Sequence, residues 1–321
     1  DKGDAWQQIA ALPTAKGIQS ISNVSVYRFF EDPQDPDALY LTTRGQGMYY
    51  TYDSGNTWQQ PNFAPLKNGF VYSVAVHPKD KCLLFATNGT QIFKSIDCSR
   101  NWEEVYREGR SGSMNIVSLA FENFSPYNLF MAQSNGDFHR SSDGGQSWTT
   151  LQRFSGYLVR IEADKFTPGR MYITTQTSGL LRSDDSGRTW KELSDAMDDF
   201  SGSTEYRNFM LHRTKKNTMY WLSKYGILYS TNAGESWNAI DLITPPGTVN
   251  IYGFSVNPKN DKEMFYTATE NDLSRSTFYK SIDGGVNWTT KKLPSAQVPT
   301  IMRIHPENGY IYLGFTIPPK Q

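Results

Sequence analysis

Short apolar segments alternate with clusters of Gly, Asn, Asp and Pro along most of the chain. In its first part we expect strands at residues 26–31, 38–43 and 47–52, and from residue 57 onward. A second set of four falls at residues 71–76, 83–87, 91–96 and 101–106, and further sets begin near residues 116, 158, 208 and 251. Short strands bounded by turn residues are typical of all-β proteins. The pattern therefore predicts repeated sheets of four strands, here called a to d.

One eight-residue sequence recurs between strands c and d. At residues 141–148 it reads Ser-Ser-Asp-Gly-Gly-Gln-Ser-Trp, and related sequences stand at residues 51–58, 95–102, 183–190, 230–237 and 281–288. The carboxylate of Asp143 can accept backbone N–H groups two or three residues on, Gly145 tolerates a conformation that a Cβ resists, and Trp148 can anchor the returning strand. From Trp58 to Trp288 there are 230 residues over five intervals, a mean of 46. This spacing indicates a repeat architecture.

This sequence is the Asp-box, or BNR repeat, and the chain resembles the Asp-box β-propellers over nearly all of its length. In layout it is most similar to propellers of the photosystem II assembly-factor type, and more distantly to sortilin-type, xyloglucanase and sialidase propellers. The resemblance implies an all-β propeller with Asp-box turns between strands c and d. It implies less about function, because function resides in sites rather than in folds.

The tryptophans predict the number of blades. Seven of them share one register relative to the repeat, at residues 6, 58, 102, 148, 190, 237 and 288. We therefore predict a seven-bladed β-propeller whose ring is closed by the N-terminal strand around Trp6. Residues 300–304 and 310–315 would be strands a and b of the last blade, and strand c would be absent or lie in residues 317–321. Residues 1–5 are expected to form a linker or frayed terminus, and residues 6–321 a single domain.

Composition excludes several classes of function. The 321 residues include 32 basic and 32 acidic side chains, so no general attraction to nucleic acid is expected. No apolar run approaches the roughly 18 residues of a membrane helix, although a lipid anchor upstream of residue 1 stays open. The four histidines lack the spacing of metal ligands, and no phosphate-binding loop, nucleophile elbow or zinc-protease motif occurs. We expect no metal and no cofactor, and we favour a protein that is not an enzyme.

The two cysteines point to a compartment. Cys82 and Cys98 flank a hairpin that turns at Asn88 and Gly89, so they should lie close together. Cys98 also falls in the second Asp-box, where Ser99 replaces the usual glycine. We predict a disulfide that braces this turn, with two free thiols as the alternative. A disulfide favours an extracytoplasmic location, whether secreted, periplasmic, lumenal or anchored at a surface.

Two sets of polar residues have expected structural roles. The acids and the amide of the Asp-boxes are expected to hold their own turns: Asp53, Asp97, Asp143, Asp185, Asn232 and Asp283. Arg28, Arg160, Glu162 and Arg303 are expected on the innermost strands, where they would line a central channel. The alternative for these arginines is a sialidase-like role, binding the carboxylate of a substrate bidentately.

The loops on the face opposite the Asp-boxes are the candidate binding site. The b–c and d–a loops differ in charge and aromatic content between repeats, and such differences give specificity. The predicted binding-face residues are Arg44, Arg107, Arg110, Tyr157, Lys224 and Tyr225. We favour a non-enzymatic, extracytoplasmic scaffold that binds a protein partner. The alternative is a glycan-binding or glycoside-hydrolase-like propeller.

Overall fold

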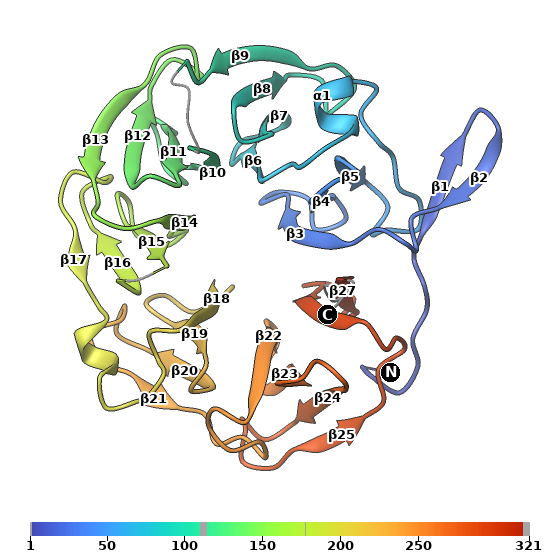
Figure 1. Ribbon diagram of the computed structural model, residues 1–321, viewed down its shortest axis with the longest axis vertical. Helices are drawn as coiled ribbons and strands as arrows, with labels where there is room; N and C mark the ends of the chain where they lie inside the picture. Colours follow the sequence, from blue (N-terminus) through green and yellow to red (C-terminus); the bar gives the residue numbers. More distant parts are fainter. Residues whose placement is uncertain (1, 110–113, 177, 317–321) are drawn as a thin grey trace. The chain divides into compact units, whose positions relative to one another are not determined.

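The computed structural model describes residues 2–109, 114–176 and 178–316, and nearly all regular structure in it is antiparallel β-sheet (Figure 1). The chain divides into two compact units. The four-blade unit comprises Ile9–Glu192, and the two-blade unit comprises Asp1–Gln8 together with Leu193–Gln321. None of the helices in the described part of the chain is long and apolar enough to cross a membrane.

The four-blade unit begins with a separate hairpin, β1 (Ala11–Thr14) and β2 (Gly17–Ser20), which extends away from blade one (Figure 1). Blade one has three strands, β3 (Val26–Glu31), β4 (Leu39–Thr43) and β5 (Met48–Thr51), and the short helix α1 (Ala64–Lys67) follows. Blade two consists of β6 (Ser73–His77), β7 (Asp80–Thr87), β8 (Gln91–Ser95) and β9 (Glu103–Arg107). Blade three consists of β10 (Ile116–Phe121), β11 (Leu129–Gln133), β12 (Asp137–Ser141) and β13 (Thr149–Arg153). Blade four consists of β14 (Leu158–Ala163), β15 (Met171–Thr175), β16 (Leu180–Ser183) and β17 (Lys191–Glu192).

The two-blade unit opens with the 3-10 helix η1 (Asp195–Met197). Blade five consists of β18 (Tyr206–Leu211), β19 (Met219–Ser223), β20 (Ile227–Ser230) and β21 (Asn238–Ala239). Blade six consists of β22 (Val249–Asn257), β23 (Asn260–Glu270), β24 (Ser276–Ser281) and β25 (Thr289–Lys291). A two-stranded sheet of β26 (Val298–Ile304) and β27 (Ile311–Thr316) ends the described chain.

The propeller has six blades, so the prediction of seven was wrong. Strands a and b of the expected seventh blade form as β26 and β27, but within the described residues this sheet has only those two strands. Residues 317–321, one expected place of strand c, lie outside the described part of the chain. Residues 6–10, the expected strand d, are not a strand. In sequence, Asp1, Gly3 and Trp6 have the Asp-box spacing, and φ is positive at Lys2 and Gly3 as in the other Asp-box turns. Among the described residues, however, the segment after Trp6 pairs with no strand c.

Trp6 is partly buried and packs against the core of the two-blade unit. Its ring meets Phe278 of β24 edge to face, with the ring centroids 5.3 Å apart. Residues 2 and 4 of the same segment make ion pairs, Lys2 with Glu263 and Asp4 with Lys291. The shared spacing of the tryptophans therefore identifies a packing position, and it does not imply a strand at each one.

Neighbouring blades bury each other's faces. Phe130 on β11 and Phe138 on β12 are fully buried and stack with their ring centroids 5.4 Å apart. Both belong to one cluster with Leu158, Ile161 and Met171 of blade four. Burying a side chain of this size contributes about 1.5–3 kcal/mol relative to leaving it exposed. Contact between blades is therefore a main source of stability in this unit.

The predicted disulfide is confirmed: Cys82 and Cys98 are bonded. The backbone N–H of Cys98 also donates to the carbonyl of Cys82 at 3.2 Å. Both residues at the centre of this Asp-box have positive φ, 59° at Cys98 and 67° at Ser99. Residues other than glycine rarely adopt this left-handed conformation. The disulfide therefore covalently holds the one Asp-box turn in which neither central residue is glycine.

The Asp-box turn of blade four docks on blade three. Trp190 meets Phe138 edge to face, with the ring centroids 5.3 Å apart. Gly187 is so close to the same ring that a Cβ built on it would lie 2.4 Å from Cε1 of Phe138. This position needs glycine for two reasons, the backbone conformation and the space.

Replacing Gly187 with alanine is expected to destabilise the protein more than the same change at Gly144. The φ angles are 83° and 73°, so each change costs about 1–2 kcal/mol for the left-handed conformation. A Cβ at Gly144 meets nothing within 4 Å, whereas at Gly187 it overlaps Phe138 and adds about 1–3 kcal/mol of overpacking. Chemical denaturation of both variants measures the difference. Equal losses of stability would contradict the docking contact.

Candidate functional site

The polar groups of the Asp-box turns form hydrogen bonds with other groups of the same turn. In blade three Oδ1 of Asp143 accepts the N–H groups of Gln146 at 3.1 Å and Ser147 at 3.0 Å, and the Ser141 hydroxyl at 2.8 Å. The hydroxyl oxygen of Ser141 accepts the N–H of Gly145 at 2.8 Å. In blade five Oδ1 of Asn232 takes the place of the acid and accepts the N–H of Ser236 at 3.0 Å. These turns therefore leave few hydrogen-bond donors or acceptors for a ligand.

These hydrogen bonds lower the pKa values of the Asp-box acids. The pKa of Asp143 falls to about 2, first through the Ser147 hydroxyl and then through the Ser147 N–H. The pKa of Asp283 also falls to about 2, first through the N–H of Asn287. At Asp185 burial acts in the opposite direction, but hydrogen bonds from Thr189 outweigh it and the pKa is again about 2. The folded state therefore strongly favours the ionised forms.

Three of the four histidines, His77, His212 and His305, accept backbone N–H groups at the ends of strand a. Nδ1 of His212 accepts the N–H groups of Thr214 and Lys215, each at 3.1 Å. His77 and His305 occupy the same place in their repeats and accept backbone N–H groups in the same way, with N···N distances of 3.2 Å at Lys79 and Glu307. Across the described residues, no group of three or more His, Cys, Asp or Glu side chains is placed to hold a metal ion.

Strand a carries a β-bulge near its start in most blades. The register shifts between Val26 and Arg28 in blade one, and at equivalent places in blades three to six and in the β26–β27 sheet. The extra residues are Tyr27, Val117, Val159, Arg207, Tyr252 and Thr300. A bulged residue is left out of the sheet's ladder of hydrogen bonds, so its carbonyl needs another partner.

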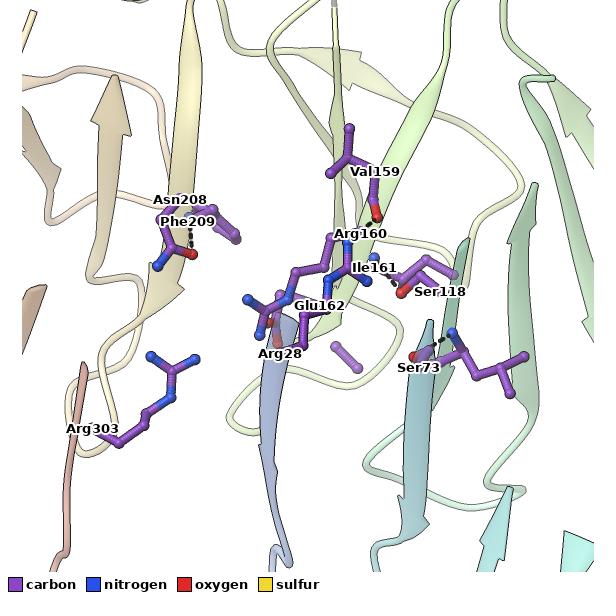
Figure 2. Close-up of polar contacts among 12 residues, drawn as sticks. Arg28, Ser73, Ser118, Val159, Arg160, Ile161, Glu162, Asn208, Phe209 and Arg303 are labelled. Atoms are coloured by element: carbon purple, nitrogen blue, oxygen red, sulfur yellow. Dashed lines mark hydrogen bonds and ion pairs between the residues drawn. The ribbon is translucent and has the colours of Figure 1, made fainter. Parts of the chain in front are cut away.

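Arg28 supplies that partner in the four-blade unit. Its guanidinium donates to the bulge carbonyl of Val159 at 2.8 Å (Figure 2). It also donates to the bulge carbonyl of Val117 at 2.9 Å and, at 3.5 Å, to the carbonyl of Tyr72, which directly precedes β6. One side chain on blade one therefore links strand a of the three blades that follow it. A guanidinium offers five N–H donors in a rigid fork, which suits this geometry.

Serines near the start of strand a, Ser73 in blade two and Ser118 directly after the bulge of blade three, make further links between blades. The hydroxyl oxygen of Ser73 accepts the N–H of Leu119 at 3.0 Å, and that of Ser118 accepts the N–H of Ile161 at 3.1 Å (Figure 2). In the two-blade unit Nδ2 of Asn208 donates to the bulge carbonyl of Tyr252 at 3.0 Å. A polar side chain at this position thus fastens each of these blades to the next.

The other predicted channel residues also bond to protein. Arg160 forms an ion pair with Glu162, two residues along β14. In the two-blade unit Arg303 donates to the carbonyl of Met302 at 2.9 Å. These contacts favour a structural role for the inner arginines over the binding of a substrate carboxylate. Their assignment to one central channel stays a prediction.

Three aromatic rings and an arginine gather at the start of strand a in blades one and two. Tyr27 meets Phe70 edge to face, with centroids 4.8 Å apart, and Phe70 stacks on Tyr72, with centroids 3.8 Å apart. The exposed Arg44, in the b–c loop of blade one, lies over the Tyr27 ring at 5.2 Å from its centroid. Burial raises the pKa of Tyr72, so the phenol stays neutral. We call Tyr27, Arg44, Phe70 and Tyr72 the aromatic–arginine cluster.

Sequence reasoning identified Arg44 but missed the three rings. The signal was present, because Tyr27 and Tyr72 each stand six residues before the proline that ends strand a, Pro33 or Pro78. Phe70 shares an alternating pattern with Tyr72. That the rings meet across two blades could not be derived from these positions.

The other predicted binding-face residues lie in different surroundings. Arg107 on β9 pairs with Glu104 at 2.6 Å. In the two-blade unit Lys224 pairs with Glu205 at 2.9 Å, and Tyr225 meets Phe200 edge to face at 5.1 Å. Arg110 lies outside the described residues. That these residues share one binding face stays a prediction.

Tyr157 borders a cavity of about 270 Å³ in the four-blade unit. The cavity lies between the connection into β10, the b–c loop of blade three and the connection into β14. Its lining residues are Met114, Ser134, Asn135, Ser155, Gly156 and Tyr157. The Tyr157 side chain is 58% exposed.

A family model described as "Sortilin, neurotensin receptor 3" matches residues 1–123 and 136–241. The chain belongs to the Sortilin-Vps10 family. No curated protein matches this Sortilin-Vps10 chain.

Several solved structures share the fold of the Sortilin-Vps10 chain. A GH74 xyloglucanase from Xanthomonas campestris is 17% identical with a TM-score of 0.68, over 91% of this chain and 51% of that one. YCF48 from Cyanidioschyzon merolae is 14% identical with a TM-score of 0.68, over 93% of this chain and 95% of that one. A structure of YCF48 bound to D1 peptide is 16% identical with a TM-score of 0.67, over 93% of both chains. The chain thus spans about half the length of the xyloglucanase, and these likenesses show the fold alone.

Replacing Arg28 of the Sortilin-Vps10 chain with leucine is expected to destabilise it by about 2 kcal/mol or more. The change leaves the carbonyls of Val117 and Val159 without their donor, and hydrogen bonds to charged groups contribute about 1.5–3 kcal/mol. Arg188→Leu is the control, because Arg188 is exposed in an Asp-box turn. Thermal and chemical denaturation measure both. A loss at Arg28 no larger than at Arg188 would contradict the linking role.

The low pKa values of the Asp-box acids predict a loss of stability in acid. The folded pKa of about 2 at Asp143, Asp185 and Asp283 lies below the roughly 3.9 of an unfolded aspartate. The stabilisation is therefore complete above about pH 4 and is lost as the pH falls toward 2. Replacing all three acids with asparagine should flatten the fall of the melting temperature between pH 4 and 2, since Asn232 shows that an amide can hold this turn.

The reverse change provides the control for this pH prediction. Asn232→Asp adds a titrating acid to blade five and should steepen the same fall. Scanning calorimetry at several pH values between 5 and 2 compares the three proteins. Parallel curves for all three would show that the Asp-box acids do not determine acid stability.

Proposed function

We propose that the chain is a non-enzymatic, extracytoplasmic scaffold that binds a protein partner through the b–c and d–a loops of its four-blade unit. The observation that carries this proposal is the aromatic–arginine cluster. Arg44 is exposed and its guanidinium lies over the Tyr27 ring, so a cation and half-buried aromatic rings are presented together. Arginine and tyrosine are enriched among the residues that dominate binding energy at protein interfaces.

Rigidity of the surrounding loops supports a role in recognition. The N–H of Gly47 donates to the carbonyl of Gly69 at 2.9 Å, and the N–H of Gly69 donates to the carbonyl of Gly45 at 3.1 Å. These bonds join the loop that carries Arg44 to the segment that carries Phe70. A partner therefore meets a surface that is already formed, which lowers the entropic cost of binding.

The family and the structural likenesses are consistent with a protein partner. The matching family is described by a receptor, neurotensin receptor 3, and one similar propeller, YCF48, has been solved bound to a peptide. Those properties belong to those proteins. For this chain, an assembly-factor role of the kind suggested by its layout is one form that the proposed scaffold could take.

The enzymatic alternative is less well supported. A glycoside hydrolase needs two carboxyl groups facing one site, and the described lining of the 270 Å³ cavity contains none. Arg28 and Arg160 are already bonded to carbonyl or carboxylate groups of the protein. The xyloglucanase that shares the fold is about twice as long as this chain, so its activity does not carry over.

The disulfide supports the proposed location. Cys82 and Cys98 are bonded, and structural disulfides persist mainly in oxidising compartments such as the periplasm, the secretory pathway and the extracellular space. A receptor-type family agrees with such a location.

Charge reversal at Arg44 tests the proposed binding surface. We expect Arg44→Glu to reduce capture of the partner at least roughly tenfold, which corresponds to the loss of one strong interface contact. Stability should change little, because Arg44 is exposed and such substitutions usually cost no more than about 0.5 kcal/mol. The matched control is Arg188→Glu, an exposed arginine in the Asp-box turn of blade four.

The measurement is quantitative mass spectrometry of extracytoplasmic proteins retained on each immobilised variant. Proteins retained by the wild type and by Arg188→Glu but lost from Arg44→Glu support the proposal. Retention that survives Arg44→Glu and fails in Arg188→Glu would place binding on the Asp-box turns and would refute it.

A further inference from the structure

We infer that the cavity bordered by Tyr157 is a binding subsite for a neutral sugar residue. This site lies between blades three and four and involves none of the residues of the aromatic–arginine cluster. It therefore adds a ligand to the proposed protein-binding function and does not depend on it.

The walls of the cavity are held in place by backbone hydrogen bonds. The N–H of Ser134 donates to the carbonyl of Asn115 at 2.8 Å, and the N–H of Asn115 donates to the Ser134 hydroxyl at 2.9 Å. On the other wall the carbonyl of Tyr157 accepts the N–H of Gln176 at 2.9 Å. The cavity thus exists before any ligand arrives, as small-molecule sites usually do.

Gly136 brings two of these walls together. Its φ is +96°, a conformation that glycine adopts readily and other residues resist. A Cβ built there would lie 2.1 Å from the carbonyl oxygen of Phe154. The N–H of Phe154 donates to the carbonyl of Gly136 at 2.9 Å. The b–c loop of blade three is therefore fixed against the segment that leads to Tyr157.

The lining is uncharged and amphipathic. Among its described residues are one aromatic ring, one thioether, two serine hydroxyls and one amide, and none is charged. The nearby charges are matched to each other, since Asp137 pairs with Arg153 at 3.3 Å. A charged ligand would lose its hydration here without gaining a counter-ion, which is unfavourable.

The side-chain amide of Asn135 has hydrogen-bonding capacity beyond its contacts with Asp137. Its Oδ1 accepts the N–H of Asp137 at 3.2 Å, and its Nδ2 donates to Oδ2 of Asp137 at 3.1 Å. An amide nitrogen carries two hydrogens, so this bond uses one of them. The second hydrogen and the Ser155 hydroxyl suit the hydroxyl groups of a ligand.

A pyranose ring fits this combination of groups. One of its faces presents C–H groups that pack on an aromatic ring, while its hydroxyls both donate and accept hydrogen bonds. Tyr157 is exposed, and its ring offers such a face. A volume of about 270 Å³ lies near the lower end of ligand pockets, which begin at about 300 Å³, and therefore suits one or two sugar rings rather than a long chain.

The sugar could be free or attached to a glycoprotein, and the test separates the two sources. Saturation-transfer NMR is recorded with methyl glucoside, methyl mannoside, methyl galactoside and N-acetylglucosamine, with sialic acid as the charged comparison. Glycoprotein binding is measured with ribonuclease B, which carries a mannose-rich glycan, against ribonuclease A, which has the same polypeptide without it.

At least one neutral saccharide should give saturation transfer, and sialic acid should give none. Tyr157→Ala should weaken that binding roughly tenfold, the loss expected for about 1.4 kcal/mol of stacking, whereas Tyr157→Phe should retain it. Tyr310→Ala is the matched control, because Tyr310 is an exposed tyrosine in the two-blade unit. Binding of ribonuclease B but not ribonuclease A identifies a glycoprotein glycan as a source.

Three outcomes would overturn the inference. The first is that none of the four neutral saccharides binds. The second is that binding is the same in Tyr157→Ala and in the wild type. The third is that a proline-rich peptide, and no saccharide, binds in a manner that depends on Tyr157. Because Tyr157 is exposed, all variants are expected to fold, and thermal denaturation confirms this for each.

Discussion

A blade of four strands cannot cover its own faces, and the rest of the structure depends on this constraint. Strands b and c of blade three are buried on both sides, and the cluster that contains Phe130 and Phe138 is completed by residues of blade four. The Asp-box turn serves this contact as well, because Gly187 and Trp190 both rest on Phe138. The repeated turn is therefore a docking element between blades as much as a connection between two strands.

The same constraint explains the polar side chains at the start of strand a. A β-bulge there removes one carbonyl from the ladder, and a buried carbonyl without a donor is costly. Arg28 resolves this by donating to the bulge carbonyls of Val117 and Val159, and Ser73 and Ser118 add links by accepting N–H groups of the next blade. An arginine whose type suggests anion binding in the sequence thus belongs to the framework. Chemistry available for recognition is left to the loops, where Arg44 and Tyr157 are exposed.

The sequence predicted the features that depend on local interactions. The Asp-box turns need only residues within eight positions of each other, and the Cys82–Cys98 pair lies across a single blade. The blade count failed because Trp6 packs on Phe278 as the other tryptophans pack in their blades, while the residues that follow it, 6–10, do not form a strand. The hairpin β1–β2 was missed as well. Features built from several segments, such as the contact of Tyr27, Phe70 and Tyr72, depend on how blades stack and could not be derived.

The two proposed sites illustrate how one scaffold can hold different chemistry. Both lie in b–c and d–a connections of the four-blade unit, and in both the backbone is fixed by hydrogen bonds that involve glycine, at Gly47 and Gly69 or at Gly136. Their side chains differ: an exposed guanidinium over an aromatic ring at Arg44, and an uncharged lining around Tyr157. Because packed blades satisfy each other's backbone groups and bury each other's apolar surface, such loops can change composition at little cost to the fold. Specificity can therefore vary from loop to loop while the Asp-box turns stay alike.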